Sequence, residues 1–494
     1  MDTPRPQAME RRSAFGLAFT AAAAIASASG CTDRPTDIGL TAPPTALAVK
    51  SVTADPHLAD AADVSFLPAS ADSVRVHYMS TDGSDTGLTP WFPGGPAAVT
   101  LLGLRAATSY TIALEARRGG ASVTGGGTLY TTPPLPQALT AMNLTRVSGT
   151  PTMAGYTLSA LPGPDGHGYL VAFDGSGSIR WYRDFGPTGV QEAKQQTNGD
   201  FTVFVGNSHG DDAVFGAYVE VKPTGDSVRS ITAKGSAYTD GHELVVTSDA
   251  NGNRTADYLF GYDIRSVDQS AFGGGSNDKL AGHQILRINT AGSADTLMQG
   301  WTYWTHADKI DVPTQIQDID HPNSIDFDRD GGMIVSFRDL GAILKIDPVT
   351  HQVLWQLGGT RNQFTFIGDP LNGFSGQHSV RVLINAHFLV FDNGVNHSIQ
   401  ASRVVEYAVN EAAKTATMVW QYTPNPSLFN PFTGSVQRLS NGNTVIAWTT
   451  FGLIDEVAPD GSLVSRVQLN SAVAVQGVAY RAIRIDNLYQ YTRP

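Results

Sequence analysis

A short unit, a tight turn followed by an apolar strand, recurs from residue 137 to the end of the chain. It restricts the possible folds more than any other feature. Six copies of the unit, several of which carry a tryptophan, span residues 174–181, 224–228, 290–297, 347–355, 416–420 and 460–464. Their spacing of roughly 45 to 70 residues is typical of four-stranded propeller blades that carry insertions. The repeat predicts a six-bladed β-propeller over residues 137–494, and seven blades are also compatible with it.

Hairpin turns and composition support an all-β fold. Turn sequences at 198–200, 330–332 and 441–443 each precede a β-branched strand, as type I′ turns favour. The chain has 51 glycines and 27 prolines, and only 16% of its residues are charged. Such a composition favours short strands joined by tight turns over long helices.

An additional domain is expected before the repeat, because 494 residues exceed one ordinary core. Residues 46–133 contain short strand candidates separated by turns, which indicates a β-sandwich. Leu104, Thr108 and Tyr110 resemble the corner of fibronectin type III domains, where a tyrosine hydroxyl bonds back to the chain. Ala106 stands where that corner usually has proline, so a generic β-sandwich also fits.

The first 31 residues are typical of an export signal. Arg11 and Arg12 precede a small, weakly apolar stretch that ends at Cys31, the single cysteine of the chain. The pattern resembles a lipobox, in which the cysteine is acylated, although Ala28 replaces the usual leucine. An ordinary signal peptide with an accidental cysteine is the alternative. We therefore expect a lipid-anchored, extracytoplasmic protein in the periplasm or at the cell surface, with residues 32–45 as a flexible tether.

Charge excludes one class of partner. The net charge is −12, and no lysine or arginine cluster appears in the globular part. Nucleic acid is therefore not expected to bind. A single cysteine also rules out an intramolecular disulfide.

Four polar segments are candidates for the functional site. A propeller builds its site on the central axis from loops of several blades, so functional residues come from scattered positions. The segments are 239–244, 318–325, 335–339 and 374–379, and they contain His242, His321, Asn323, Arg338 and His378. Such residues also occur in propellers as purely structural partners of turns and carboxylates. Three histidines can also bind zinc, but no helical His–Glu pair or close cysteine and histidine spacing supports a metal site.

The order of these segments resembles the bacterial arylsulfotransferase family over roughly residues 137 to 470. The resemblance is carried by the stretches 321–325, 336–338, 343–347, 353–359, 377–378, 391–394, 402–407 and 434–443. Members of that family are six-bladed β-propellers with an N-terminal β-sandwich. The resemblance therefore implies the same two-domain, all-β fold for this chain.

The resemblance also implies roles for individual residues. His378, which follows a glutamine, matches the nucleophilic histidine of the family. His321 and Asn323 match its His-x-Asn segment, Arg338 matches the arginine that closes the next strand, and His242 matches a further histidine less directly. These matches imply that His321, Arg338 and His242 are catalytic together with His378, and that Asn323 and Arg338 bind the sulfuryl oxygens of the substrate. Pro322 and Phe337 depart from the residues usual at their positions, which leaves the phenol specificity open.

The implied activity moves a sulfuryl group from an aryl sulfate ester to a phenol through a covalent sulfohistidine. No nucleotide donor, metal or other cofactor is expected, and the partners are small phenols and aryl sulfates. The aromatic residues Trp301, Trp304 and Phe374 are candidates to bracket the phenol ring or to fill the blade cores. The sandwich is a candidate homodimer contact.

Two other functions remain open from the sequence. One is a non-catalytic, surface-tethered propeller lipoprotein that binds ligands or partners. The other is a different propeller enzyme, such as a lyase or a quinone-dependent dehydrogenase. The latter usually carries tryptophan-docking repeats and a calcium-binding carboxylate set, which are not evident in this sequence.

Overall fold

A computed structural model describes residues 48–489, except 56–57, 59, 67–70, 95–97, 209–213, 237, 309–317 and 470–478. The predicted signal peptide with Cys31 and the predicted tether lie outside the described residues. The described residues all belong to one unit, Pro43–Pro494. None of the helices in them combines the length and apolar character that crossing a bilayer requires.

The N-terminal part consists of two β-sheets that enclose an apolar core. Residues on alternate positions of β2 are buried, as a half-covered strand requires. Val64 of one sheet and Val76, Ile112 and Leu114 of the other belong to the same buried cluster. The first sheet contains β1 (Val49–Ala54), β2 (Ala62–Phe66) and β6 (Ala98–Leu101), and the second contains β3 (Ser73–Ser80), β4 (Thr86–Leu88), β5 (Phe92–Pro93), β7 (Ser109–Arg118), β8 (Ala121–Thr124) and β9 (Thr128–Thr131).

Tyr110 forms the hydrogen bond to the chain that its sequence context predicted. Its side chain is fully buried, and its hydroxyl accepts a hydrogen bond from the backbone N–H of Arg105 at 2.8 Å. The same hydroxyl donates to the carboxylate of Asp85 at 2.5 Å. Asp85 in turn accepts two hydrogen bonds from the guanidinium of Arg180, at 2.8 and 3.0 Å.

We expect Tyr110→Phe to lower the free energy of unfolding by about 1–3 kcal/mol, because the Arg105 N–H loses its acceptor and the Asp85 carboxylate loses one of its donors, keeping Arg180. Urea denaturation followed by far-ultraviolet circular dichroism measures the change. Tyr130→Phe is the matched control, since the Tyr130 hydroxyl is buried without a hydrogen-bond partner among the described residues. Equal effects of the two substitutions would contradict the importance of the Tyr110 contacts.

Within the described part of the chain, six sheets of four or five strands follow the sandwich. Two short helices, α1 (Gln137–Ala141) and α2 (Gly300–Tyr303), lie between strands. The all-β prediction is therefore confirmed. The first two sheets contain β35 (Ala482–Ile485), β11 (Tyr156–Pro162), β12 (Gly168–Phe173) and β13 (Ile179–Asp184), and β14 (Val190–Gln195), β15 (Phe201–Ser208), β16 (Val214–Val221) and β17 (Ser227–Ile231). The next two contain β18 (Tyr238–Ser248), β19 (Arg254–Val267), β20 (Asp278–Asn289) and β21 (Ala294–Gln299), and β22 (Pro322–Phe327), β23 (Met333–Phe337), β24 (Ala342–Ile346) and β25 (Val353–Gly358). The last two contain β27 (His378–Val382), β28 (Phe388–Asp392), β29 (Arg403–Asn410) and β30 (Thr415–Tyr422), with β26 (Thr365–Ile367) beside β30, and β31 (Ser435–Arg438), β32 (Thr444–Trp448), β33 (Leu453–Val457) and β34 (Leu463–Gln468), with β10 (Thr145–Gly149) beside β34.

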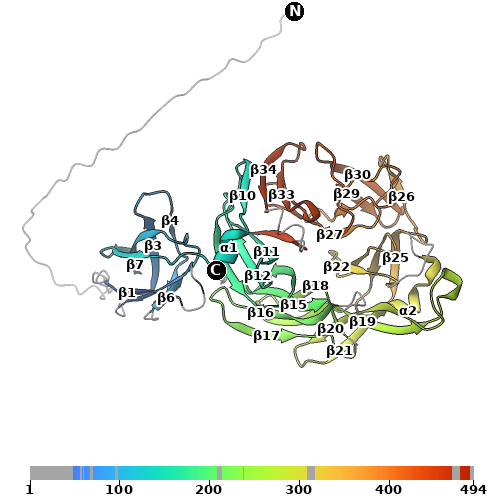
Figure 1. Cartoon of the computed structure of the whole chain (residues 1–494), viewed down its shortest axis with the longest axis horizontal. Helices are drawn as coiled ribbons and strands as arrows, with labels where there is room; N and C mark the ends of the chain where they lie inside the picture. Colours follow the sequence, from blue (N-terminus) through green and yellow to red (C-terminus); the bar gives the residue numbers. More distant parts are fainter. Residues whose placement is uncertain are drawn as a thin grey trace, which may run out of the picture. The chain divides into compact units, whose positions relative to one another are not determined.

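The six sheets surround a common centre in a β-propeller-like arrangement (Figure 1). The first strand of each sheet contacts the first strand of the next, in the cyclic order β35, β14, β18, β22, β27, β31 and back to β35. Buried apolar side chains fill the space between neighbouring sheets; for example, Trp355 stacks on Phe388 with ring centroids 6.0 Å apart. Side chains at the ends of the first strands therefore meet near the centre.

Strands from the two ends of the chain share sheets. β35 pairs with β11, and β10 pairs with the outer strand β34, both in antiparallel register. The ring is thus closed by main-chain hydrogen bonds between segments more than 300 residues apart, as Tyr156 pairing with Ile485 shows.

Hairpins occur at the three predicted positions, but their turns are not type I′, because only the glycine of each turn, and not the residue before it, has a positive φ. Gly199, Gly331 and Gly442 each connect the first two strands of a sheet and have φ between 85° and 89°, a conformation that glycine adopts without strain. The Gly331 hairpin joins β22, the inner strand that carries Asn323, to β23.

Candidate active site

Three histidines from three different sheets meet near the centre of the ring. His242 lies in β18, His321 immediately precedes β22, and His378 begins β27. The rings of His242 and His321 have centroids 4.7 Å apart, and those of His321 and His378 are 6.4 Å apart. The structure thus brings together histidines that lie far apart in the sequence.

Arg338 lies beside His321 because the two residues flank neighbouring strands. The Arg338 N–H donates a hydrogen bond to the carbonyl of His321 at 2.9 Å. Its guanidinium donates to the carboxylate of Asp339 at 2.6 Å and to the carbonyl of Pro431 at 3.3 Å. Its Nε is buried and has no acceptor among the described residues. A cation with an unused donor at this point is suited to bind an anion.

His378 is buried and held in one tautomer by Asn393. Its Nδ1 lies 2.8 Å from Oδ1 of Asn393. The Asn393 amide nitrogen already donates to the carbonyls of Asn430 and Thr433, at 2.7 and 2.9 Å, so its oxygen is the acceptor for His378. The proton therefore sits on Nδ1, and Nε2 keeps its lone pair, facing the N–H of Thr433 at 3.3 Å.

Burial keeps His378 uncharged. The pKa of His378 lies well below the ordinary 6.5, first because burial disfavours the imidazolium and then because of the positive charge of Arg338. The neighbouring histidines act in the same direction, whereas the hydrogen bond to Asn393 opposes them. A neutral imidazole with a lone pair on Nε2 is a nucleophile.

His321 has the opposite protonation tendency. Burial lowers its pKa, but the Asp318 carboxylate, 3.1 Å from Nδ1, raises it more, so the pKa of His321 lies above 6.5. Its backbone has a left-handed φ of 50°, and its N–H donates to the carboxylates of Asp318 and Asp320 at 3.1 Å each. His321 is therefore suited to donate a proton, and it lies beside an uncharged imidazole.

His242 is oriented by Asp240. Its Nδ1 lies 2.9 Å from both oxygens of the Asp240 carboxylate, which also accepts the His242 N–H at 2.8 Å. Asp240 is fully buried, which would raise its pKa, but His242 and His283 hold that pKa well below its usual range. The carboxylate thus stays ionised and fixes the ring.

Asn323 contacts the residue that precedes His378 and its strand, β27. Its amide is fully buried, and Nδ2 donates to the carbonyl of Gln377, the residue before His378, at 2.8 Å. The Gln377 amide donates in turn to Ser336, Phe337 and Ala342 of the neighbouring sheet, at 3.0 Å each. Asn323 and Gln377 therefore set the position at which β27 begins.

A protein-family model described as Arylsulfotransferase (ASST) matches residues 155–481, which include all five of these residues. The chain belongs to this family. Membership in the arylsulfotransferase family implies aryl sulfotransferase activity on phenols and aryl sulfates. Among curated proteins, none matches the sequence.

Several solved structures are similar to this arylsulfotransferase-family chain. One is a protein of unknown function from Bacteroides caccae, at 12% identity and a TM-score of 0.40, with 68% of this chain and all 100% of that one covered. A streptogramin B lyase shares 11% identity at a TM-score of 0.34, over 68% of this chain and 90% of that one. The fn3 domain of human collagen alpha-1(XX) shares 30% identity at a TM-score of 0.16, over 22% of this chain and 93% of that domain. Because these TM-scores are so low, none of the three similarities supports a function for this chain.

The site contains two residues that sequence reasoning did not single out. Tyr480 lies with its ring 5.5 Å from that of His242, and its hydroxyl donates to the Asn323 carbonyl at 3.4 Å. His283 of β20 lies behind His242 and His321 and contacts their carboxylate partners. Neither residue belongs to a recognisable motif, so only the three-dimensional pairing reveals them.

The three aromatic candidates lie outside this group. Trp304 and Phe374 are buried in separate hydrophobic clusters, and the indole N–H of Trp301 donates to the Asp263 carbonyl at 2.7 Å. The structure therefore favours the blade-core interpretation of Trp304 and Phe374.

Buried ion pairs join the inner strands next to the histidines. Glu243, which follows His242, accepts hydrogen bonds from Arg481 at 3.0 Å and from Arg381 at 2.9 Å, and it pairs with Lys194. Arg481 also donates to Glu192 at 2.8 Å. Because these residues come from β14, β18, β27 and the segment before β35, the pairs link four sheets at the centre.

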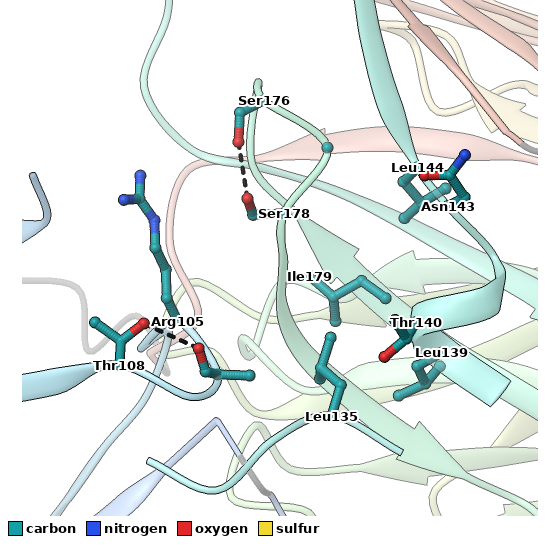
Figure 2. Close-up of a pocket in the computed structure, with 12 residues that line it drawn as sticks. Arg105, Thr108, Leu135, Leu139, Thr140, Asn143, Leu144, Ser176, Ser178 and Ile179 are labelled. Carbon is teal, nitrogen blue, oxygen red and sulfur yellow. Dashed lines mark hydrogen bonds between the residues drawn. The ribbon is translucent and has the colours of Figure 1, made fainter. Parts of the chain in front are cut away.

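Two other features do not compete with the histidine group. A hollow of about 350 Å³ near α1 is lined by Arg105, Leu139 and Ser178 among others, and Figure 2 shows no histidine in it. Asp328, Asp330 and Glu411 form an acidic cluster, but the Lys345 ammonium lies among them at 2.9, 2.6 and 2.5 Å. The space between these carboxylates, where a metal ion would bind, is therefore already filled by the Lys345 ammonium.

Proposed function

We propose that the protein transfers a sulfuryl group from an aryl sulfate ester to a phenol through a covalent sulfohistidine on His378. The observation that supports this most is the buried His378, whose Nδ1 is held by Asn393, whose pKa is lowered by burial and by the charge of Arg338, and whose ring centroid lies 6.4 Å from that of His321. The site is neutral at the attacking atom and positive around it, as the transfer of a charged sulfuryl group requires.

In the first step, Nε2 of His378 attacks the sulfur as the bond from sulfur to the aryl oxygen breaks. The bonding pair leaves with the phenolate oxygen, which takes a proton from the His321 imidazolium. The products are a phenol, a neutral His321 and a sulfuryl group bonded to Nε2. The Asn393 oxygen holds the Nδ1–H while His378 becomes positively charged.

In the second step, the acceptor phenol loses its proton to His321 and attacks the sulfur. The nitrogen–sulfur bond breaks, its electron pair returns to His378, and the new aryl sulfate leaves. His321 is again protonated, so one proton serves both half-reactions. No nucleotide sulfate is needed, because the donor is itself an aryl ester.

Arg338 and His242 have charge-stabilising roles in this scheme. The transition state of such a transfer is loose and in line, so positioning and charge stabilisation provide most of the catalysis. Arg338 contacts the sulfuryl oxygens as a forked cation, and His242, held by Asp240, contacts them from the opposite side. Asn323 acts by positioning the residue before His378.

We further propose that each of the six sheets is one blade of a six-bladed propeller, and that the N-terminal sheets form a fibronectin III-like sandwich. The cyclic order of the first strands and the Tyr110 corner support these assignments. The proposed cellular form is a lipoprotein anchored through Cys31 outside the cytoplasm, with the sandwich as a candidate homodimer contact.

One assay tests the proposed function. Colour release from a nitrophenyl sulfate is measured with and without phenol and with a chelator, and the intact mass is recorded after donor alone. Phenol-stimulated, chelator-insensitive release and an added sulfuryl group are expected. Equal release in water and in phenol would indicate a sulfatase, and no release would favour a ligand-binding protein.

The activity should depend on pH in a bell-shaped manner. Because its pKa is lowered, His378 stays neutral even when the pH falls below 6.5. Because its pKa is raised, His321 stays protonated even when the pH rises above 6.5. We therefore expect the acid limb of kcat/KM below pH 6.5 and the basic limb above it. A profile in which activity rises only above pH 7 would contradict a burial-neutralised nucleophile.

A further inference from the structure

We propose that His283 is a positioning residue that clamps the carboxylate partners of His242 and His321 and thereby couples the protonation states of these two histidines. This inference rests on the proposed function, since it assigns a role within the same site. His283 is 2% exposed and lies in β20, behind the residues that face the substrate.

Each ring nitrogen of His283 faces a carboxylate. Nδ1 lies 2.6 Å from Oδ1 of Asp320, and Nε2 lies 3.3 Å from Oδ2 of Asp240 as an ion-pair contact. The Asp318 carboxylate is 3.7 Å from Nδ1. Only Nδ1 makes a hydrogen bond, but a lone pair on Nε2 would face the Asp240 carboxylate, so the position of the ring between two carboxylates favours the imidazolium.

The carboxylates around His283 are those that orient the two site histidines. The Asp240 oxygen nearest His283 is also 2.9 Å from Nδ1 of His242. Asp320 Oδ1 accepts both His283 and the backbone N–H of His321, while Asp318 accepts the His321 ring. A continuous series of contacts therefore links His242 to Asp240, Asp240 to His283, and His283 to Asp318 and Asp320, which contact His321.

Charge balance explains why this position holds a cation. The charged or titratable groups facing His283 in the described residues are Asp240 from β18, Tyr262 from β19, and Asp318 and Asp320 before β22. Burial alone would lower the pKa of His283, but these carboxylates raise it well above 6.5. Without that cation, three buried or half-buried aspartates would repel one another behind the site.

A metal ion explains the same residues less well. His283, Asp318 and Asp320 lie close enough to share an ion. However, ligand atoms bound tetrahedrally to a metal at about 2.1 Å stay roughly 3.4 Å apart, whereas Nδ1 of His283 and Oδ1 of Asp320 are 2.6 Å apart. That separation is the length of a charge-assisted N–H to oxygen hydrogen bond.

His283→Gln tests the clamp, because glutamine keeps a donor but not the charge. We expect kcat to fall on the order of tenfold to a hundredfold at an unchanged KM for the aryl sulfate, since His242 and His321 lose their alignment. The basic limb of the pH profile should move upward by at least about half a unit, because His321 then faces less compensated carboxylates. A burst titration with the donor alone counts the active molecules.

His387→Gln is the matched control. It removes a histidine that pairs with Glu406 at 2.7 Å in another sheet, and it should leave kcat and the pH profile unchanged. If His283→Gln only lowers the number of active sites and the pH limb stays in place, the role is structural and the proposal is wrong. Unchanged kinetics, or activity restored to chelated protein by a divalent metal, would also overturn it.

Gly300→Ala perturbs the same clamp without changing the His283 side chain. A Cβ at Gly300 would overlap Oδ2 of Asp320 and come within 3.2 Å of the His283 carbonyl oxygen, so the carboxylate must shift from its present position. A fall in kcat at an unchanged KM is expected here as well, and wild-type kinetics would contradict the clamp.

Nitrogen NMR of histidine-labelled protein gives a readout that does not need activity. One ring should remain doubly protonated about one pH unit above the ordinary histidine value, and its signal should be absent in His283→Gln. A wild type that transfers no sulfuryl group would refute the proposed function, while the NMR spectrum still decides the state of His283. An active wild type without that protonated ring refutes the clamp alone.

Discussion

We expect His378→Ala to reduce transfer from a nitrophenyl sulfate to phenol by about 10⁴-fold or more, the scale on which removal of a covalent nucleophile acts. Because alanine offers no lone pair, the sulfuryl adduct seen by intact-mass analysis after donor alone should also disappear. Steady-state kinetics and mass spectrometry on the same preparation measure both effects.

The substitution should spare the fold. His378 hydrogen-bonds Asn393 at its side chain, whereas the β27 backbone pairs independently with β28. His387→Ala, in the same sheet, is the control and should transfer at the wild-type rate. Turnover of His378→Ala within tenfold of wild type, or an adduct on a different residue, would remove His378 as the nucleophile.

Arg338→Lys should lower kcat/KM by about 10²- to 10³-fold, the usual cost of losing one group that stabilises developing charge. Lysine keeps the charge but loses the planar fork that can contact two sulfuryl oxygens at once. The loss should appear in kcat as well as in kcat/KM, because the contact strengthens in the transition state. Kinetics with donors of different leaving-group pKa measure it.

Arg265→Lys is the control for that substitution. Arg265 is an exposed arginine that pairs with Asp263 in another sheet, so its replacement should change nothing. Arg338→Lys also removes little of the positive charge near His378, so the acid limb of the pH profile should stay in place. An unchanged rate would show that Arg338 serves only to hold Asp339 and the Pro431 carbonyl.

The strand-rich fold and the site residues that begin inner strands could be predicted from the sequence. Gly199, Gly331 and Gly442 indicate hairpins because their turns need a positive φ, and this requirement is local. His321 and His378 could also be identified from the sequence, since each lies at the recognisable start of a strand.

Residues whose role depends on tertiary pairing could not be predicted. His283 lies inside β20 between ordinary strand residues, and its partner Asp320 is 37 positions away. Tyr480 reaches the site only because the C-terminal segment returns to the centre beside β18 and β22. The sequence predicted that Asn323 belongs to the site. It could not predict that the Asn323 amide donates to the Gln377 carbonyl, because these residues are distant in the sequence and meet only in the folded chain.

Closure of the ring by its two ends affects when the enzyme can work. Tyr480, Arg481 and β35 follow all three central histidines in the sequence, and β35 completes the sheet that contains β11. A nascent polypeptide on the ribosome therefore holds all three central histidines before it holds the last element that encloses them. We therefore expect the site to be complete only once the chain has been synthesised through β35, so a variant cut before Tyr480 should transfer no sulfuryl group.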